Sequence, residues 1–429
     1  MSRRIAEEVV GYLSLRPGET SSRREFPKAS VREWKRALNW LDLSGLALYF
    51  RRRLSDNDAL DRVPREVTAE LERRQCENDV RIATMRESFA AVNRAFETSH
   101  IRYTVLKGFA LAPDYCVKAS LRTQADFDYL IAEEAVESAQ RALGEMGYVL
   151  KDRKDDELSF WIPASEPTNS RDQYSRRTPW TVELHLAVWD QKILPLSGIA
   201  RQEFVDGVTM REWTGLRFPS LRPREMFLAQ VLHVFRHLID GWIKLAWLLE
   251  IGNFLATHAA ESAFWGEFAS LVEREPRLAE VTAMVCHMSE ELFRPPTPPL
   301  IRSWKLNMRP SVRLWFEKYA REFLFQGIPR FDLSFNSPSK LVLLLQEQYL
   351  SDTQTRHKLR SRLLFPWHRL RASRPSGRPQ LSLRKRVVHR ARWLGLVLLY
   401  HFGANVRYWW ELRRWRRLTK RQANWSTGS

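Results

Sequence analysis

Apolar residues in the N-terminal part of the chain recur at the interval of an α-helix. Within residues 30–98, five of them are spaced three and four positions apart: Ile82, Met85, Phe89, Val92 and Phe96. This spacing places them on one face of a helix, as in a surface helix that packs against a core. The pattern predicts a helical N-terminal region over residues 1–98.

After residue 98 the pattern changes to short runs rich in β-branched and aromatic residues. Three such runs predict strands: residues 101–106, 126–131 and 180–186. Residues 133–146 predict a helix, and the proline-containing stretch 151–179 predicts a long loop or an irregular hairpin. Strands separated by a helix and by long connections favour a compact core of mixed α and β structure over residues 99–220.

Helical spacing returns from residue 222. Six apolar residues form one stripe there: Phe227, Val231, Leu232, Phe235, Leu238 and Ile239. Three later segments also predict helices: 261–274, 277–293 and 310–325. We therefore predict a helical domain over residues 221–350, followed by a basic, partly amphipathic tail over 351–429 with a linker at 370–380. The predicted fold class is α+β, a small mixed sheet with helices embedded in mainly helical N- and C-terminal regions.

The net charge of the chain is concentrated near its C-terminal end. The protein has 69 Lys and Arg against 50 Asp and Glu, a formal net charge of +19. Residues 353–429 contain 20 Lys and Arg and a single acid, Glu411, so residues 1–352 are neutral overall. This distribution excludes a uniformly basic nucleic-acid-binding protein and indicates a neutral globular body with a strongly basic tail.

The cysteines and the apolar runs indicate in which cellular compartment the protein is expected. Cys76, Cys116 and Cys286 are far apart and odd in number, unlike a disulfide framework or a CxxC metal site. The first residues lack the long apolar run of a signal peptide. The apolar run Trp393–Phe402 is about half of the ~20 residues that cross a bilayer as a helix. The expected location is cytoplasmic, with peripheral association at the inner membrane face as a further expectation.

Two carboxylates share one face of the predicted strand 126–131. Side chains two positions apart on a strand point to the same side, so Asp126 and Asp128 project together. Their mutual repulsion is relieved by a bound cation, and hard oxygen ligands suit Mg²⁺. On the strand 180–186, Glu183 and His185 also share a face. If the two strands are neighbours, Glu183 is a third carboxylate of the site, and His185 has either a direct role or a structural hydrogen bond.

A lysine and a glycine follow the first predicted strand. Gly108 allows close approach of the backbone to a phosphate, and Lys107 is suited to neutralise its charge. The pattern differs from a Walker A loop, whose spacing is absent. Arg122, just before the acidic strand, is a second candidate phosphate partner. Each motif alone is weak, whereas their order along the chain is more specific.

Other polar residues in the helical part have simpler interpretations. His233 and His237 are four positions apart and share a helix face, but zinc binding would need a third ligand and no HExxH pattern is present. We therefore favour helix packing or a contact at the active-site cleft for both. Glu250 either faces a nucleotide or lies on an exposed helix face.

The ordered motifs resemble the uncharacterised nucleotidyltransferase family of the polymerase-β-like superfamily. The resemblance is carried by VLKGFALA (105–112), LRTQADFDYLI (121–131), the following helix that ends in MGY, and VELH (182–185). LAQVLHVFRHL (228–238), IKLAWLLEIGNFL (243–255) and the later RLLFP are also similar. The resemblance covers most of residues 30–400, and its strongest motifs lie within 105–131 and 182–185.

The resemblance implies a polymerase-β-like core that binds an NTP with two Mg²⁺ ions and transfers a nucleoside monophosphate to a hydroxyl acceptor. It assigns Asp126, Asp128 and Glu183 as catalytic metal ligands. It places Gly108, with Lys107 before it, in the phosphate-binding turn. Arg122 and His185 are further candidates for contact with the nucleotide or its phosphates, from their positions in the sequence. One departure is Phe109, because the turn of the wider superfamily usually has Ser or Gly at this position. Glu183 in place of the more usual third Asp is chemically compatible.

The basic tail has three interpretations. Basic clusters flank the apolar run within residues 384–417, which is typical of a helix at an anionic membrane surface. The same composition suits RNA or DNA through phosphate neutralisation and Trp or Arg stacking, which we consider the weaker alternative. The third interpretation is a packed C-terminal helix with solvated arginines.

Three functions follow in order of preference. The first is a Mg²⁺-dependent nucleotidyltransferase, because its acidic set is intact. The second is a catalytically degenerate scaffold with this core, which Phe109 favours. The third is a nucleic-acid-binding protein driven by its tail, which the neutral charge of residues 1–352 opposes. No short motif in the sequence identifies the NTP or the acceptor. The candidate acceptors are a sugar, a small metabolite, a protein hydroxyl and RNA.

Overall fold

The computed structural model describes most of the chain. The described residues are 2–16, 26–154, 156–163, 173–191, 194–196, 204, 208–325, 340–350, 353–364 and 383–426. They divide into two compact units, which we describe separately. The first comprises residues 1–190, 196–233 and 245–305, and the second comprises 191–195, 234–244 and 306–429.

The first unit begins with four helices. They are α1 (Ser2–Tyr12), α2 (Val31–Ser44), α3 (Ala47–Asp56) and α4 (Arg65–Thr98). All five apolar residues that predicted a helix near residue 90 lie on α4 and are buried, so this prediction is confirmed. α4 also buries polar side chains in its N-terminal half, among them Arg74, Asn78 and Arg81. This helix therefore has two different buried surfaces, one apolar and one polar.

A seven-stranded mixed sheet forms the centre of this unit. Its strands are β1 (Tyr103–Val105), β2 (Asp126–Ile131), β3 (Val149–Arg153), β4 (Glu157–Trp161), β5 (Thr181–His185), β6 (Val208–Trp213) and β7 (Leu216–Leu221). Their order is β3-β4-β5-β2-β1-β7-β6. β2 pairs with β5 and β1 with β7 in parallel, and the other pairs are antiparallel.

The three predicted strands are confirmed as β1, β2 and β5. The stretch predicted as a loop or irregular hairpin contains β4, which forms an antiparallel hairpin with β3. β6 and β7 were not predicted. They form a second hairpin, whose turn at Thr214 and Gly215 has positive φ at both residues.

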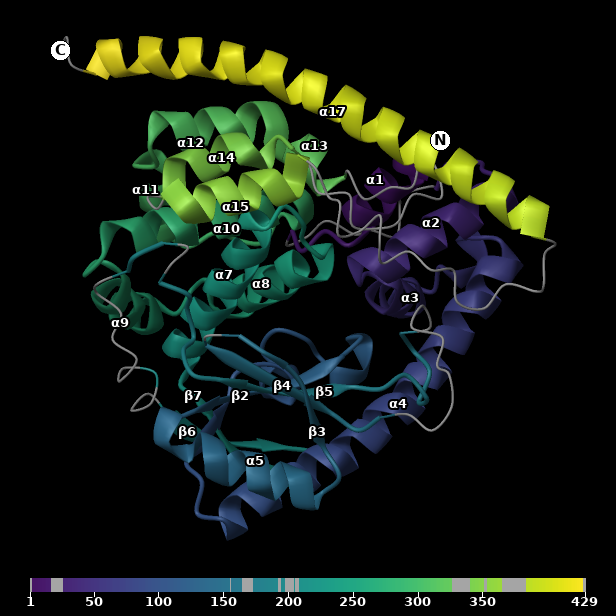
Figure 1. Ribbon diagram of the computed structural model, residues 1–429, viewed down its shortest axis with the longest axis vertical. Helices are drawn as coiled ribbons and strands as arrows, with labels where there is room; N and C mark the ends of the chain where they lie inside the picture. Colours follow the sequence, from purple (N-terminus) through teal and green to yellow (C-terminus); the bar gives the residue numbers. More distant parts are fainter. Residues whose placement is uncertain are drawn as a thin grey trace. The chain divides into compact units, whose positions relative to one another are not determined.

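The two faces of the sheet differ in character. Phe89 of α4 contacts Phe127, Tyr129 and Phe218, so α4 covers the face to which these aromatic residues point (Figure 1). α5 (Val136–Glu145) follows β2 and contacts α4. Because side chains alternate along a strand, Asp126 and Asp128 point to the opposite face. The aromatic packing thus directs the acids away from the hydrophobic core.

Helices C-terminal to the sheet complete the first unit. They are the N-terminal part of α7 (Pro223–Ile239), then α8 (Leu245–His258), α9 (Ser262–Val272), α10 (Pro276–Phe293) and α11 (Pro299–Leu306). Phe227 stacks on Phe254 and contacts Trp265 and Phe268 edge-on. These aromatic residues form the core between the helices. The helices predicted at 261–274 and 277–293 are confirmed as α9 and α10.

The second unit is helical in its described part. After the end of α7 it contains α12 (Pro310–Trp315), a π-helical turn (Phe316–Ala320), α13 (Arg321–Leu324), α14 (Val342–Tyr349), α15 (Thr353–Leu364) and α17 (Leu383–Ser426). The indole N–H of Trp315 donates to the Leu341 carbonyl at 3.0 Å. The predicted linker at 370–380 lies outside the described residues. Among the described residues, we find no helix with the length and apolarity that a bilayer crossing requires.

Candidate active site

The register of the sheet brings the predicted acids together. β2 and β5 are adjacent and parallel, with Asp126 opposite Thr181 and Asp128 opposite Glu183. Residues paired in this way point to the same face, so the two carboxylates project side by side. The condition on which Glu183 depended, that its strand lies beside 126–131, is therefore met.

Asp128 is at the centre of a buried polar cluster. Its Oδ1 atom lies 2.9 Å from Lys107 Nζ, which donates to it, and 2.9 Å from His185 Nε2. Its Oδ2 atom is buried and has no hydrogen-bond partner among the described residues. One ligand atom each from Asp128, Glu183 and His185 can be chosen so that all lie within 4.8 Å of one another. A buried carboxylate oxygen without a partner, beside a second carboxylate and an imidazole, fits a cation ligand.

The electrostatics of the cluster separate its two carboxylates. Burial favours the neutral form of Asp128, but the Lys107 ammonium and His185 outweigh it and hold the pKa of Asp128 below its ordinary value. Burial, reinforced by the charges of Asp128 and Asp126, raises the pKa of Glu183 to about 7. Burial opposes charging of Lys107, yet Asp128 and Asp126 raise its pKa. Near neutral pH, Glu183 is thus the carboxyl group that can gain or lose a proton.

The turn after β1 has the geometry that a glycine requires. Gly108 has a φ of +65°, in the left-handed region that favours glycine, and an added Cβ would lie 3.1 Å from Gln124 Nε2. Phe109, the departure from the superfamily pattern, is buried and stacks on Trp213 at 4.5 Å. It also contacts Phe89 edge-on. The ring therefore anchors the turn in the aromatic core of the helix-covered face.

Gln124 is a site residue that the sequence analysis missed. Its side chain is 5% exposed, and neither its Nε2 nor its Oε1 has a hydrogen-bond partner among the described residues. A buried primary amide with both ends unsatisfied is costly, so it indicates a missing partner. The amide lies beside Gly108, at the turn expected to meet phosphate. The available signal was only a polar residue two positions before the DxD pattern.

Arg122 is paired inside the protein. Its Nε donates to Glu250 Oε1 at 2.7 Å, and Tyr49 Oη donates to the same oxygen at 2.8 Å. Arg122 Nη1 also lies 3.5 Å from the Gly108 carbonyl oxygen. Glu250 is buried, so the interpretation of an exposed helix face is wrong for this residue. The ion pair joins α8 to the segment between Gly108 and β2.

The polar surface of α4 holds the two loops that lead into the acidic strands. Asn78 Nδ2 donates to the carbonyls of Ser120 and Arg122, at 2.8 and 2.9 Å. Arg81 donates to the carbonyls of Gln124, before β2, and of Ser175 and Thr178, before β5. These buried side chains donate hydrogen bonds to loop carbonyls that precede the two strands. They therefore position the start of both strands that carry the acids.

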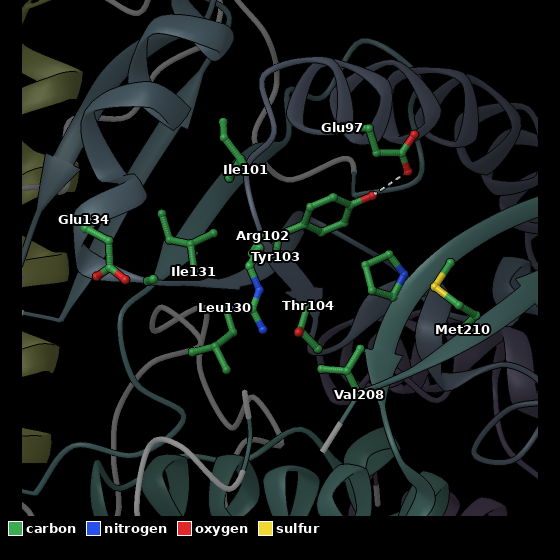
Figure 2. Close-up of a pocket in the computed structure, with 12 residues that line it drawn as sticks. Glu97, Ile101, Arg102, Tyr103, Thr104, Leu130, Ile131, Glu134, Val208 and Met210 are labelled. Atoms are coloured by element: carbon green, nitrogen blue, oxygen red, sulfur yellow. Dashed lines mark hydrogen bonds between the residues drawn. The ribbon is translucent and has the colours of Figure 1, made fainter. Parts of the chain in front are cut away.

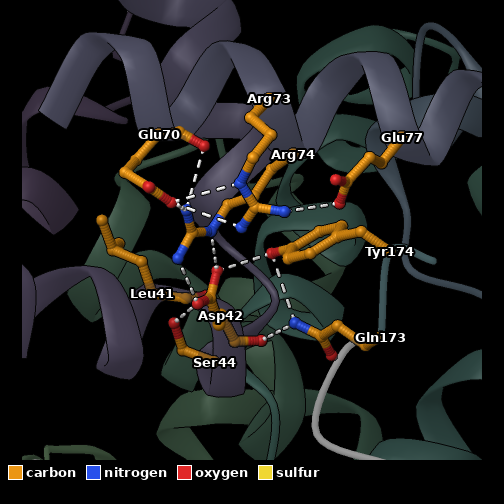
Figure 3. A network of polar contacts seen from close by, with 9 residues as sticks. All are labelled: Leu41, Asp42, Ser44, Glu70, Arg73, Arg74, Glu77, Gln173 and Tyr174. Atoms are coloured by element: carbon orange, nitrogen blue, oxygen red, sulfur yellow. Dashed lines mark hydrogen bonds and ion pairs between the residues drawn. The ribbon is translucent and has the colours of Figure 1, made fainter. Parts of the chain in front are cut away.

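A second network extends this support toward α2 (Figure 3). Arg74 donates from Nε and Nη2 to the two carboxylate oxygens of Asp42, at 2.8 and 3.0 Å. Tyr174 Oη donates to Asp42 Oδ1 at 2.7 Å, and Gln173 Nε2 donates to the Asp42 carbonyl at 2.6 Å. The loop before β5 is thus held by α2 as well as by α4.

The two helical histidines have aromatic neighbours. The His233 ring meets Trp247 edge-on at 4.7 Å, and the His237 ring meets Trp242 at 4.3 Å. Neither belongs to the group of metal-type ligands found among the described residues. These contacts support the packing interpretation.

A cavity of about 670 Å³ lies further along the same strands (Figure 2). Its lining includes Thr104 of β1, Leu130 of β2 and Met210 of β6, with Arg102 and Glu134 at the strand ends. Thr104 pairs with Leu130, and Leu130 points to the same face as Asp128 two residues earlier. The cavity therefore adjoins the acidic face of the sheet.

Comparisons with known proteins bear on this arrangement. Searches against curated proteins and against solved structures gave no significant match. A family model described as uncharacterised nucleotidyltransferase matches residues 30–294, which contain the whole acidic cluster and the Gly108 turn. This match covers more than half of the chain and the elements that build the site. The chain therefore belongs to the uncharacterised nucleotidyltransferase family.

Proposed function

We propose that this protein is a Mg²⁺-dependent nucleotidyltransferase that transfers a nucleoside monophosphate from an NTP to a hydroxyl acceptor. The observation that carries the proposal is the cluster of Asp128, Glu183 and His185, in which the buried Asp128 Oδ2 has no hydrogen-bond partner in the described part of the chain. The Lys107–Gly108 turn adjoins it through the Lys107–Asp128 contact. Membership of a nucleotidyltransferase family supports the reaction class.

Asp126, Asp128 and Glu183 are the proposed metal ligands. Asp128 and Glu183 are paired across the sheet, and the charge of Asp126 acts on both Glu183 and Lys107. When bound, two Mg²⁺ ions would neutralise the triphosphate and lower the pKa of an acceptor hydroxyl. In this proposal His185 orients Asp128 through the hydrogen bond to Oδ1 and also lies near the phosphates.

The phosphates would meet the turn after β1. Gly108 lets the backbone approach closely, and the Lys107 ammonium supplies positive charge beside it. The Gln124 amide, whose two ends lack partners among the described residues, is placed to hydrogen-bond the bound nucleotide. Arg122 contributes by holding the turn, since its own charge is paired with Glu250.

In the transfer step the acceptor oxygen forms a bond to the α-phosphorus, and the bond from the α-phosphorus to the pyrophosphate oxygen breaks. The acceptor proton goes to Glu183, the carboxylate paired with Asp128 across the sheet, which acts as the general base. We assign the acceptor to the cavity of Figure 2, because Leu130 in its lining shares the face of Asp128. Met210→Trp would narrow this cavity and should lower the yield of product without weakening NTP binding.

The test is incubation of the protein with each α-³²P-labelled NTP and Mg²⁺ in native lysate, followed by separation of labelled products. Asp128→Asn should reduce labelling by about 10²–10³-fold or more, the range seen when one such electrostatic contact is lost. Asp152→Asn, an exposed acid on β3 of the same sheet, is the matched control and should leave labelling unchanged. Equal labelling by the wild type and Asp128→Asn would refute the site.

The second candidate is a nucleotide-binding scaffold without turnover. It is favoured by the Lys107–Asp128 ion pair, which already compensates one carboxylate without a metal. Calorimetry separates the two functions. A scaffold would bind NTP and Mg²⁺ in an Asp128-dependent way while forming no labelled product from any NTP.

A further inference from the structure

The long C-terminal helix α17 exposes an apolar stripe. Six of its large apolar side chains are exposed in one stretch: Leu394, Leu398, Leu399, Phe402, Val406 and Trp409. Successive members are three or four residues apart, except for the adjacent pair Leu398 and Leu399, so all six lie on one side of the helix. Val388 before them and Trp410 after them are also exposed. A row of exposed apolar side chains like this is unusual on a surface that faces water, so it indicates a binding partner.

Another face of the same helix is packed within the second unit. Tyr408, Leu412 and Trp415 are buried. Tyr319 Oη donates to Glu411 Oε2 at 2.7 Å, and Lys340 donates to Asn405 and to the carbonyl of His401. The helix is therefore anchored by one side, so the exposed stripe is held in place on a folded body.

The charges around the stripe indicate what covers it. No Asp, Glu, Lys or Arg occurs between Leu394 and Val406, a length of about 18 Å along the helix. Basic clusters stand at both ends, residues 384–386 before it and 413–417 after it. The single acid of residues 353–429, Glu411, is buried in its hydrogen bond to Tyr319. Along the sequence, the exposed apolar stripe thus lies between two basic clusters, and the four arginines of the second cluster are exposed.

We propose that this stripe lies in the surface of an anionic lipid bilayer. Apolar side chains there reach the boundary of headgroups and acyl chains, while Lys and Arg contact anionic headgroups. A nucleic acid would need cations along the contact face, which the centre of the stripe lacks. A second copy would bring two sets of basic clusters together, which like-charge repulsion opposes.

The packed face and the exposed face together define an orientation. With the stripe in the headgroup region, the helix axis lies in the membrane plane and the Tyr408, Leu412 and Trp415 side remains in contact with the second unit. The helix thereby docks a folded enzyme on the surface. The proposal concerns where the protein acts and is independent of the transfer reaction.

Flotation of the full-length protein with vesicles tests it, without NTP or Mg²⁺. The assay uses ~100 mM salt, at which the screening length is about 10 Å. The protein should float with vesicles of phosphatidylcholine and phosphatidylglycerol at a 3:1 ratio. The floated fraction should be at least fivefold smaller with vesicles of pure phosphatidylcholine. Leu399→Gln/Phe402→Gln should weaken binding about tenfold or more, through lost apolar burial. Val117→Gln/Leu306→Gln is the matched control, because both residues are exposed apolar side chains outside the stripe.

Four outcomes would overturn the proposal. The first is no flotation of the wild type, and the second is an equal loss in the control variant. The third is that the wild type forms a dimer, detected by light scattering, and does not bind vesicles, and that Leu399→Gln/Phe402→Gln dissociates this dimer. That result would assign the stripe to a contact with a second copy. Tight binding of a 30-nucleotide RNA by the wild type without vesicle binding would likewise transfer the stripe to nucleic acid.

Discussion

Two long helices depart from the usual amphipathic pattern in opposite directions. α4, with 34 residues, buries Arg74, Asn78 and Arg81, whereas α17, with 44 residues, exposes Leu399 and Phe402. The buried polar groups of α4 bond loop carbonyls in front of the acidic strands. The exposed apolar groups of α17 have no such partner within the described chain. A buried polar face therefore marks a positioning role inside the protein, and an exposed apolar face marks a contact outside it.

The largest expected effect tests whether α17 really has two different faces. Trp415 is 1% exposed and Trp410 is 61% exposed, five residues apart on one helix. Trp415→Ala should lower the free energy of unfolding by about 3–5 kcal/mol, as for a large buried aromatic residue. Trp410→Ala should change it by less than about 0.5 kcal/mol. Thermal and urea unfolding of both variants measure the difference, and equal effects would show that the two faces are not distinct.

A slightly smaller effect tests the polar face of α4. Arg81→Met should lower the free energy of unfolding by about 2–4 kcal/mol, because it removes the charged donor from the carbonyls of Gln124, Ser175 and Thr178. It should also weaken Mg²⁺ binding, since both loops lead into the acidic strands. Arg73→Met is the control on the exposed side of α4, where its ion pairs are solvated. A stability loss with unchanged Mg²⁺ affinity would limit Arg81 to a structural role.

A buried polar residue without a partner should behave differently from those of α4. Gln124→Leu replaces an amide that has no hydrogen-bond partner among the described residues by an apolar side chain of similar size, so the free energy of unfolding should stay the same or rise by about 1 kcal/mol. NTP affinity should fall about tenfold, the loss of about 1.4 kcal/mol expected for one good hydrogen bond. Unfolding and calorimetric titration of the same variant provide both readouts. If stability falls and affinity does not, the amide is a structural group.

The last expected effect is spread over a range of pH and comes from the charge of the site. The pKa of Glu183 is raised from 4.5 to about 7, so the folded metal-free protein retains a proton that the unfolded chain has released between these pH values. The stability of the metal-free protein should therefore fall as pH rises through this window. Mg²⁺ affinity should rise by up to about tenfold per pH unit below 7, as the proton is displaced. Calorimetric titrations at pH 6, 7 and 8 measure this slope, and Glu183→Gln should abolish it.

Local pattern was sufficient for the elements with strong periodicity. The stripe from Ile82 to Phe96 predicted α4, and the run 126–131 coincides with β2. β6 and β7 were missed because β7 contains Pro219 and β6 lies at the edge of the sheet, with polar residues between its apolar ones. The signal that was available is Gly215 between two short runs, at a turn whose two positive φ angles suit a hairpin.

Long-range partners account for what the site analysis missed. The phosphate role expected of Arg122 stays a prediction, whereas its ion pair with Glu250, 128 residues further along the chain, was missed because no local pattern relates the two. Gln124 was overlooked because an isolated glutamine in a loop carries no motif. Its significance comes from burial beside Gly108, a property of the folded chain.

Side chains alternate along a strand, so the sequence already required Asp126 and Asp128 to share a face. The charge count alone assigned the net charge of +19 to the last 77 residues. Neither property depends on other segments. The pairing of Asp128 with Glu183, the burial of Glu250 and the choice of which side of α17 faces out depend on contacts between distant segments. These are decided by packing, because periodicity reports which residues share a face but not what that face meets.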